Sequence, residues 1–341
     1  MKAAVQEQAK QPMVIKDVPD PSPEIGEVLI KVQAAGVCHS DIHIADGDLA
    51  AFGFDPYPLI MGHEIAGAVE QVGSGVSGIN IGDHVGVHFI LPCGHCPYCQ
   101  IGEEESCLEY LTTFAGVGWT MNGGYAEYVK VPANRVVPLP PTIDFVDAAS
   151  LFCAGLTTYA GFKNAGLQPG QRVAVLGIGG LGHLAILIAR AMGAEVIAIT
   201  STEAKVKLAR QLGAHEVING ADVESGKRLL AMGGANVILS TTIAPQAIAP
   251  TMAGLLPQGA LVLTGATMAP LPVVPMMLMV PQHRVIGSLV GSSQEQRELL
   301  QLAVDHHIRP MTETYALEDV NIAHDRLRTN QLRFRAILTP N

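Results

Sequence analysis

The arrangement of apolar and polar residues changes at about residue 153. Before this point, short apolar runs such as 27–33, 66–72 and 125–131 are separated at short intervals by turns rich in Gly and Pro. Runs of this length between turn signals are typical of antiparallel strands. We therefore expect a mainly β domain in the first 150 residues.

Beyond residue 153, strand-like runs alternate with helical stretches. An apolar run at 173–176 precedes a stretch of helical length at 181–192, and a second strand and helix follow at 195–200 and 203–212. Strands that alternate with helices predict βαβ units and a parallel, doubly wound sheet of the Rossmann type. Further strand-like runs lie at 216–218, 237–239 and 260–263.

The end of the chain contains a helical stretch at 294–304 and a strand-like run at 335–338. A chain of 341 residues exceeds the usual size of a single core, so we expect two domains. We predict that 1–152 and 287–341 form the first domain, and that 153–286 form the second.

A methionine-rich run, 276–280, lies between Pro275 and Pro281. Methionine often fills gaps in apolar packing. We expect this run to lie in the buried core or in a contact between subunits.

The charge of the chain narrows the class of partner. With 21 basic and 31 acidic residues, the net charge is −10 at pH 7, and there is no long basic run. This balance argues against a nucleic acid or an anionic membrane surface and favours a small-molecule substrate. The amino terminus lacks the apolar run of a signal peptide, and glycines, two arginines and Glu195 interrupt the most apolar stretch, 172–200. We expect a soluble, cytoplasmic protein.

The segment Gly177, Ile178, Gly179, Gly180, Leu181, Gly182 matches the G-x-G-x-x-G pattern. The pattern alone is weak evidence, but here it follows a predicted strand and opens a predicted helix. The first glycine allows a tight turn, the second lets the backbone approach a pyrophosphate, and the third allows close helix–strand packing. We expect a dinucleotide site; a purely structural glycine turn is the alternative.

The end of the second strand of this domain bears on the choice of coenzyme. An acid at this place would bond the adenosine ribose of NAD and repel a 2′-phosphate, whereas this chain has Thr200, Ser201 and Thr202. Small hydroxyl residues leave room for the phosphate, and Lys205 could supply positive charge. We therefore expect NADP(H). NAD(H) is the alternative, since Glu203 is close enough to face the ribose.

Lys205 belongs to a group of three basic residues with Lys207 and Arg210 on the predicted helix 203–212. We expect at least two of the three to form an ordinary solvated helix face.

Four cysteines, Cys93, Cys96, Cys99 and Cys107, lie within fifteen residues, and their spacing suits tetrahedral Zn²⁺. Four thiolates leave no position for a substrate, so the loop 93–107 is expected to hold a structural zinc. Disulfides are one alternative. A redox or nucleic-acid zinc module is another, although the acidic run 103–105 disfavours DNA.

The remaining cysteines, Cys38 and Cys153, are far from this cluster and from each other. With His63 from a Gly-His-Glu segment they would make an open metal site, which keeps one position for a substrate. Because the three residues are far apart in sequence, only the fold can unite them.

The chain resembles the zinc-dependent medium-chain alcohol dehydrogenases over nearly its whole length. It is closest to their bacterial and yeast-like branch, with a coenzyme loop like that of the cinnamyl-type enzymes. The resemblance implies a GroES-like mainly β catalytic domain beside the Rossmann domain. The segments that carry it are CHSDIH (38–43), GHE (62–64), the four-cysteine loop, NGGYAEY (122–128), LFCAGLTTY (151–159) and GIGGLGH (177–183).

The resemblance implies that Cys38, His63 and Cys153 bind a catalytic zinc, so that each chain carries two zinc ions. Glu64 would lie just behind the metal, and Asp41 would accept the second ring N–H of His63.

It also implies roles for further residues on the first helix of the catalytic domain. Ser40 would bond the substrate oxygen, and His43 would pass the proton to solvent. His39 would face the pyrophosphate of the coenzyme, as would Arg335, while Thr157 and Leu181 would pack on the nicotinamide.

The expected substrate pocket departs from that of the small-alcohol enzymes. Leu49 stands where they carry a tryptophan, and 50–55 is enlarged, which suggests a roomier site. Trp119, the sole tryptophan, could line the pocket with Phe89 and Leu289. Ordinary loop packing is the alternative for Trp119.

Together these features predict an NADP(H)-preferring zinc alcohol dehydrogenase or aldehyde reductase acting on medium-chain or aromatic primary alcohols. Zinc as a Lewis acid would let an alkoxide form near neutral pH, and hydride would pass to the nicotinamide. We expect a homodimer or homotetramer. The alternatives are an NAD-dependent enzyme of the same family, a zinc-free quinone or enoyl reductase on the same fold, and a nucleotide-sensing protein without turnover.

Overall fold

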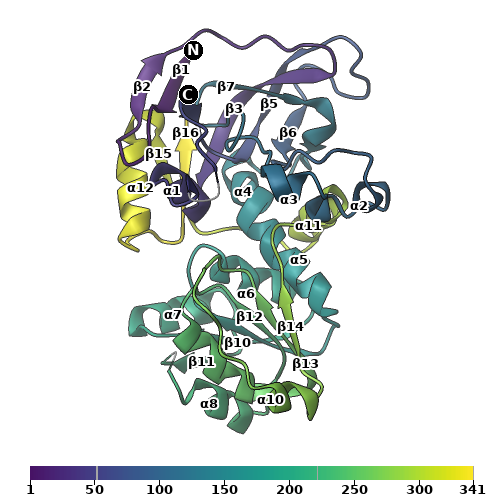
Figure 1. The fold of residues 1–341 in the computed structure, drawn as a ribbon, viewed down its shortest axis with the longest axis vertical. Coiled ribbons are helices and arrows are strands. Elements are labelled where there is room, and N and C mark those ends of the chain that lie inside the picture. The colour runs from purple at the N-terminus through teal and green to yellow at the C-terminus, as the bar shows by residue number, and fades with distance from the viewer. Residues whose placement is uncertain (51–52, 221, 341) are drawn as a thin grey trace. The chain divides into compact units, whose positions relative to one another are not determined.

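The computed structural model describes residues 1–50, 53–220 and 222–340, which form two compact units (Figure 1). Unit 1 comprises Met1–Cys153, Ser292–Val304 and Arg309–Asn341, and unit 2 comprises Ala154–Gly291 and Asp305–Ile308. The chain therefore enters unit 2 after Cys153 and returns to unit 1 at Ser292.

Unit 1 is built on a seven-stranded sheet whose main path runs β15-β16-β3-β5-β6-β8, with β7 paired to β3. All these pairs are antiparallel except β15 with β16. The long central strand β3 is almost entirely buried, which gives the unit its core. The strands are β3 (Glu27–Val37), β5 (Glu64–Val72), β6 (His84–Val87), β7 (Tyr128–Pro132), β8 (Val136–Pro138), β15 (Thr312–Ala316) and β16 (Arg335–Thr339).

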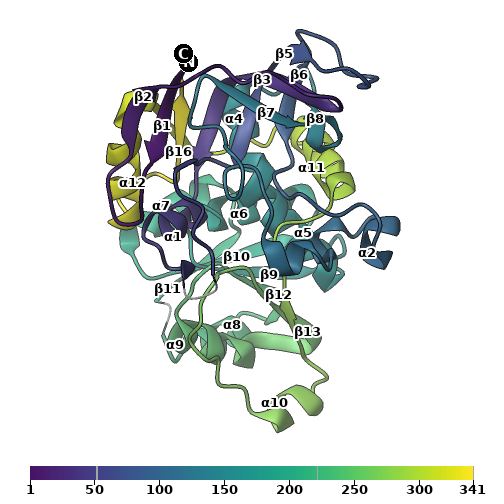
Figure 2. The same cartoon turned by 45° about the horizontal axis from the view of Figure 1, so that its top comes forward.

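A smaller antiparallel sheet of unit 1 has the order β2-β1-β4. Short helices join the strands, and Figure 2 shows α1 close to α12, as their contacts confirm. The remaining strands are β1 (Lys2–Gln6), β2 (Val14–Asp17) and β4 (Leu59–Ile60). The helices are α1 (His39–Ala45), α2 (Pro97–Gln100), α3 (Tyr110–Thr113), α4 (Phe145–Ser150), α11 (Ser293–Asp305) and α12 (Val320–Arg328).

Unit 2 contains a six-stranded parallel sheet in the order β11-β10-β9-β12-β13-β14. Its central strands are continuous apolar runs, as expected for parallel strands covered on both faces. The strands are β9 (Arg172–Leu176), β10 (Glu195–Thr200), β11 (Glu216–Asn219), β12 (Ala235–Ser240), β13 (Leu255–Leu263) and β14 (Arg284–Gly287).

The helices of unit 2 connect these strands, and the order of the strands reverses between β9 and β12. This reversal is the place where doubly wound sheets bind nucleotides. The predicted combination of a mainly β domain and a doubly wound parallel sheet is confirmed. The helices are α5 (Leu156–Ala165), α6 (Gly182–Ala191), α7 (Glu203–Gln211), α8 (Ser225–Ala231), α9 (Pro245–Ile248) and α10 (Pro275–Met279).

One helical stretch, Phe145–Ala165, is long and apolar enough to cross a membrane by length and composition. Of its most apolar window, 78% is buried inside the protein, as in a helix of a globular core.

The methionine-rich run forms α10, and the prediction that it lies in the buried core is wrong. Met276, Met277, Met279 and Val280 are between 53% and 74% exposed. An apolar pattern of this length does not distinguish a core segment from a surface covered by a partner. The alternative prediction, a contact between subunits, stays open.

Candidate active site

The fold brings Cys38, His63 and Cys153 together within unit 1. Cys38 follows strand β3 and precedes α1, His63 directly precedes β5, and Cys153 lies in a single wide helical turn after α4. Their side-chain donor atoms, with a carboxylate oxygen of Glu64, all lie within 4.8 Å of one another. The Sγ atoms of Cys38 and Cys153 are 4.0 Å apart.

His63 is oriented as a metal ligand. Its Nδ1 lies 3.0 Å from Oδ1 of Asp41, and because a carboxylate only accepts, Nδ1 carries the proton. Nε2 then presents a lone pair. This atom is buried and has no hydrogen-bond partner among the described residues. Two sulfurs and a free imidazole nitrogen are the donors that Zn²⁺ prefers, so the residues present fit the ion.

The charges around the two sulfurs favour a thiolate on Cys38. The hydrogen bond with Cys153 lowers the pKa of Cys38 well below its ordinary value, burial opposes this effect, and His63 adds to it. The hydrogen bond that the Cys153 thiol donates to Cys38, together with burial, raises the pKa of Cys153 well above its ordinary value. Since the thiolate is the form that binds metals, at least one of the two sulfurs is in the form that binds a metal ion.

Glu64 lies behind these ligands and is buried with Arg335. Burial raises the pKa of Glu64 to about 7, although Nη2 of Arg335 donates to Oε2 and opposes this effect. Gly36 makes room for the pair, because a Cβ at this position would lie 2.0 Å from Oε2 of Glu64. Arg335 was predicted from the sequence to face the coenzyme. In the structure its guanidinium group is paired with Glu64, within unit 1.

Helix α1 carries the other predicted catalytic residues. Sγ of Cys38 lies 3.8 Å from Oγ of Ser40, so this hydroxyl is beside the predicted metal ligands. His43 is 39% exposed, and its Nδ1 lies 2.7 Å from Oδ2 of Asp48. The sequence analysis did not assign Asp48. His39, at the start of α1, is exposed.

Two aromatic rings flank His63. The ring centroid of Phe89 lies 4.9 Å from that of His63, and the centroid of Trp119 lies 5.7 Å away at an interplanar angle of 85°. Both aromatic side chains are buried. Trp119 and Phe89 therefore lie beside His63, and their place in a substrate pocket stays a prediction.

The other predicted pocket residues are not brought to this place by any described contact. Leu49 follows α1 and is half-buried. Leu289 belongs to unit 2 and is 55% exposed. Within the enlarged segment 50–55, residues 51 and 52 lie outside the described residues.

The second candidate metal site is formed by Cys93, Cys96, Cys99 and Cys107, whose sulfurs lie within 4.8 Å of one another. The Sγ–Sγ distances of Cys99 to Cys96 and to Cys93 are 3.5 Å and 3.9 Å, too long for a disulfide. Backbone N–H groups, chiefly those of Cys99 and Leu108, lower the pKa of Cys96 to about 6. All six cysteines of the chain lie within the described residues and are free.

The glycine-rich turn of unit 2 connects β9 to α6. Gly177 has a φ of +88°, which favours glycine, and a Cβ on Gly182 would lie 1.9 Å from the carbonyl oxygen of Gly177. A Cβ on Gly179 would meet no atom within 4 Å. The space over Gly179 is thus open, as the approach of a pyrophosphate requires. Gly180 and Leu181 complete the turn before α6.

The residues predicted to choose the coenzyme lie at the end of β10 and the start of α7. Thr200 is buried, whereas Ser201 and Thr202 are exposed. Lys205 is half-buried, and burial lowers the pKa of its ammonium group. Oε2 of Glu203 accepts a hydrogen bond from Nδ2 of Asn219 at 2.7 Å.

Lys207 and Arg210 are exposed on the same helix, as expected for a solvated face. Thr157, predicted to contact the nicotinamide, is buried in α5 of the same unit.

Comparison with known proteins agrees with this geometry. Residues 24–141 match the family model of the alcohol dehydrogenase GroES-like domain, and residues 180–305 match that of the zinc-binding dehydrogenases. An alcohol dehydrogenase from Geobacillus stearothermophilus is 38% identical over 340 residues, which cover 99% of each chain. This chain belongs to the medium-chain alcohol dehydrogenase family.

Further members of the family are similar over most of the chain. A probable cinnamyl alcohol dehydrogenase 6 from Arabidopsis thaliana is 36% identical over 318 residues, covering 92% of this chain and 86% of that protein. The crystal structure of the alcohol dehydrogenase from Aeropyrum pernix superimposes with a TM-score of 0.89 at 32% identity, covering 100% of both chains. The resemblance found in the sequence is thereby confirmed.

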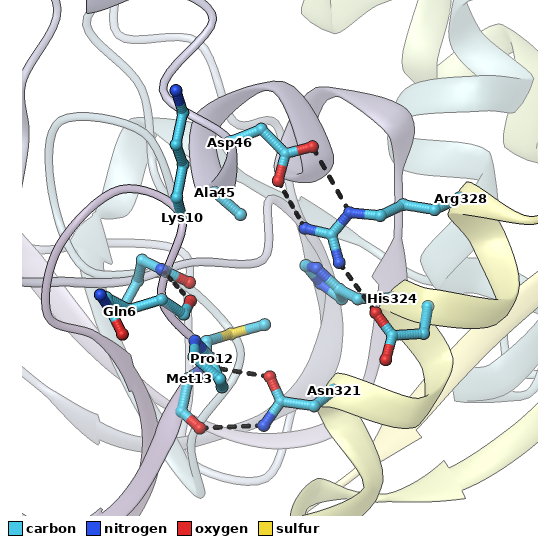
Figure 3. A pocket seen from close by; sticks show the side chains of 11 residues that line it. Gln6, Lys10, Pro12, Met13, Ala45, Asp46, Asn321, His324 and Arg328 are labelled. Atoms are coloured by element: carbon cyan, nitrogen blue, oxygen red, sulfur yellow. Dashed lines mark hydrogen bonds and ion pairs between the residues drawn. The ribbon is translucent and has the colours of Figure 1, made fainter.

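This alcohol dehydrogenase also has a cavity of about 320 Å³ in unit 1 (Figure 3). It lies where α1 ends beside α12, and its wall includes the ion pair between Asp46 and Arg328, with Nη2–Oδ1 at 2.7 Å. His324 of α12 also lines it. None of the predicted catalytic or metal-binding residues lines this cavity in the described part of the chain.

Proposed function

We propose that this alcohol dehydrogenase interconverts primary alcohols and aldehydes, medium-chain or aromatic, with NADP(H), and that Cys38, His63 and Cys153 hold its catalytic zinc. The observation that carries the proposal is the buried Nε2 of His63, which has no partner among the described residues and faces two cysteine sulfurs. An imidazole fixed by Asp41 on one side and free on the other is the arrangement of a metal ligand.

When bound, zinc supplies a Lewis acid that lowers the pKa of a substrate hydroxyl, and the nicotinamide exchanges hydride with the substrate. The proton steps fall to α1. Ser40, beside Cys38, would take up the hydroxyl proton of the alcohol as it releases its own. His43 would accept the released proton and pass one to solvent. Asp48 accepts a hydrogen bond from the ring of His43 and would orient this ring for the transfer.

Phe89 and Trp119 support a preference for large apolar substrates, because their buried rings lie beside His63. Leu49 in place of a tryptophan points the same way. The name of the plant relative, a probable cinnamyl alcohol dehydrogenase, refers to an aromatic alcohol and is consistent with this preference.

The preference for NADP(H) rests on three features of unit 2. The small side chains of Thr200, Ser201 and Thr202 leave room for a 2′-phosphate. Lys205 is a half-buried cation that a phosphate would stabilise. Glu203, the acid that could bond the ribose of NAD instead, already accepts a hydrogen bond from Asn219.

The pyrophosphate would bind over Gly177–Gly182 of the glycine-rich turn, where the N-terminal end of α6 attracts anions. His39 and Arg335 would contact the pyrophosphate, and Thr157 and Leu181 would contact the nicotinamide.

Cys93, Cys96, Cys99 and Cys107 would hold a second, structural zinc. Free cysteines throughout the chain suit a reducing compartment, and we propose the cytoplasm. We also propose a homodimer or homotetramer, because the edge strand β14 and the exposed apolar side chains of α10 offer a surface for a second copy.

A metal assay and a substrate panel test the proposal together. We expect two zinc ions per purified chain, and oxidation of cinnamyl alcohol and hexanol with a higher kcat/KM for NADP⁺ than for NAD⁺. Cys38→Ala should keep one zinc and the fold of the coenzyme unit but lose turnover. Turnover that survives this substitution would contradict the ligand assignment, and a clear preference for NAD⁺ would contradict the coenzyme assignment.

A further inference from the structure

Tyr125 is a buried tyrosine that lies between the metal ligands and α12. It ends the turn 122–125, just before strand β7, and its side chain has no exposed surface. Both its main chain and its hydroxyl group are bonded to segments that carry proposed zinc ligands.

The main chain of this turn holds the segment that ends at His63. The N–H of Gly123 donates to the carbonyl of Ile60 at 2.7 Å, that of Gly124 donates to Gly62 at 2.7 Å, and that of Tyr125 donates to Met61 at 2.9 Å. Three successive residues therefore fix the backbone immediately before His63.

The ring of Tyr125 packs on the same segment. Gly62 has a φ of +91°, and a Cβ there would lie 2.3 Å from Cδ1 of Tyr125. Only glycine fits between this ring and His63, so the ring and the ligand are held at a fixed spacing.

The hydroxyl of Tyr125 is linked to the ring of His63 through the carboxylate of Asp41. It donates to Oδ2 of Asp41 at 2.8 Å, and the same oxygen accepts the N–H of Cys38 at 2.9 Å. Oδ1 of Asp41 accepts from Nδ1 of His63 at 3.0 Å. One carboxylate thus joins the backbone of one ligand to the ring of another, and Tyr125 supplies its third hydrogen bond.

We propose that Tyr125 is a positioning residue of the catalytic metal site: its hydroxyl fixes the carboxylate of Asp41 and thereby the positions of Cys38 and His63. This inference rests on the proposed role of these two residues as zinc ligands. Burial and the charge of Asp41 raise the pKa of Tyr125 well above its ordinary value, so the hydroxyl is a permanent donor.

The ring of Tyr125 also contacts His324 of α12, which lines the cavity shown in Figure 3. The two rings meet edge to face, with centroids 5.8 Å apart and an interplanar angle of 76°. This contact helps to hold the ring of Tyr125 in place.

Tyr125→Phe removes the hydroxyl and keeps the ring, so it tests the hydrogen bonds of this hydroxyl: the one to Asp41 and a longer one, at 3.5 Å, to the carbonyl of Gly36. The measurement is the affinity of the zinc-loaded, full-length enzyme for Zn²⁺, determined by competition with a chromogenic chelator. Loss of a hydrogen bond behind a ligand commonly weakens metal binding 10-fold to 100-fold. We expect one of the two zinc ions to bind about 10-fold more weakly, and the zinc of the four cysteines to serve as an internal standard.

Two further variants separate positioning from general stability. Tyr128→Phe, three residues away on β7, removes a hydroxyl that forms no hydrogen bond within the described residues, and should leave both zinc affinities unchanged. In an Asp41→Asn background, Tyr125→Phe should change zinc affinity less than twofold, because the two residues act through one another. The Co²⁺-substituted enzyme should show a shifted visible spectrum with Tyr125→Phe and none with Tyr128→Phe.

The outcomes distinguish this inference from the proposed function. If the wild-type enzyme binds zinc only at the four cysteines, the proposed catalytic site is wrong. If it binds two zinc ions and Tyr125→Phe keeps both affinities within twofold of wild type, the positioning role is wrong. A lower melting temperature with unchanged zinc affinity would likewise assign the hydroxyl to stability and overturn the inference.

Discussion

Glu104 and Arg135 form an ion pair through both oxygens and both terminal nitrogens, with Nη1–Oε2 at 3.2 Å and Nη2–Oε1 at 3.1 Å. Glu104 lies in the cysteine loop between Cys99 and Cys107, and it also accepts a hydrogen bond from the N–H of Ser293 at 3.2 Å. Ser293 is the first residue of α11, so one carboxylate joins the cysteine loop to the sheet and to a helix start.

Glu104→Gln should destabilise the enzyme, because the amide cannot accept both charged hydrogen bonds. Hydrogen bonds to charged groups contribute roughly 1.5–3 kcal/mol, so we expect a loss of about 2 kcal/mol at pH 7. The free energy of unfolding in urea measures it. Glu103→Gln, on an exposed neighbour, is the control and should have little effect.

The ion pair between Glu104 and Arg135 also predicts how the stability of the enzyme depends on pH. Burial raises the pKa of Glu104, but hydrogen bonds from Arg135 and Ser293 more than offset this effect and lower it to about 2. A carboxyl whose pKa is lowered by folding stabilises the protein fully above its unfolded pKa, about 4.5, and progressively less between pH 4.5 and 2. The difference between wild type and Glu104→Gln should therefore shrink below pH 4.5. A difference that stays constant down to pH 3 would contradict this account.

Cys96→Ser should remove the zinc of the cysteine loop and lower stability, because this site would then lack one of four ligands. We expect zinc content to fall from two ions to one per chain and the melting temperature to decrease. Cys38→Ser is the matched variant: it should also lose one zinc, but with loss of turnover as its main effect. Equal losses of turnover and stability in both variants would argue against two separate functions for the two zinc ions.

Lys205→Ala should weaken binding of NADP⁺ selectively. If the ammonium group contacts the 2′-phosphate, kcat/KM for NADP⁺ should fall about 10-fold, the size of one charge-assisted hydrogen bond. The value for NAD⁺ should change less than twofold. Lys207→Ala, on the exposed side of the same helix, is the control. If Lys205→Ala leaves the ratio of kcat/KM for NADP⁺ to that for NAD⁺ unchanged, Lys205 belongs to the solvated face of the helix.

Local motifs predicted the parts of the fold and site that depend on neighbours in sequence. The cysteine loop and the glycine-rich turn each lie within a few residues, and strand and helix periods gave the two domain types. The open metal site needed the fold, since Cys38 and Cys153 are 115 residues apart.

The contacts that orient this site could not be predicted. Tyr125 and Asp41 are separated by 84 residues, and Arg335 and Glu64 by 271. Buried hydrogen bonds between such distant positions follow from strand register, which no local pattern gives. Hydrophobicity alone likewise did not distinguish a buried core from an exposed surface for the methionine-rich helix.

His324 should make stability fall on mild acidification. Burial lowers the pKa of this histidine from 6.5 to about 4, and the positive charge of Arg328 lowers it further. The nearby carboxylates have the opposite, smaller effect; they are Asp41, Asp325 and Asp46. The unfolded chain then binds a proton between pH 6.5 and 4 that the folded chain does not, so stability is lost as pH falls through this range. A shift of this size corresponds to about 3 kcal/mol. His324→Leu should flatten the dependence of the unfolding free energy on pH between 7 and 4.5, and an unchanged slope would contradict the assignment.

Oligomeric state provides the last test, through the surface formed by α10 and β14. Within the described residues, β14 pairs only with β13. Val285 of β14 is exposed, as are Met276 and Met279 of the preceding helix α10. Apolar side chains next to an open strand edge usually meet a partner, and a two-fold contact of this edge with its copy would continue the sheet. Met276→Lys combined with Met279→Lys should therefore shift sedimentation from a dimer or tetramer toward smaller species.

The control for this surface is Ile25→Lys, because Ile25 is an isolated exposed apolar residue in unit 1, and it should not change the assembly. Sedimentation velocity at several protein concentrations measures each variant. A wild-type enzyme that sediments as a single chain of 35.9 kDa would refute the assembly. If the double variant remains fully assembled, the copies meet at another surface. At this surface, the two introduced lysines would be buried opposite the same lysines of the second chain, and their repulsion would separate the chains.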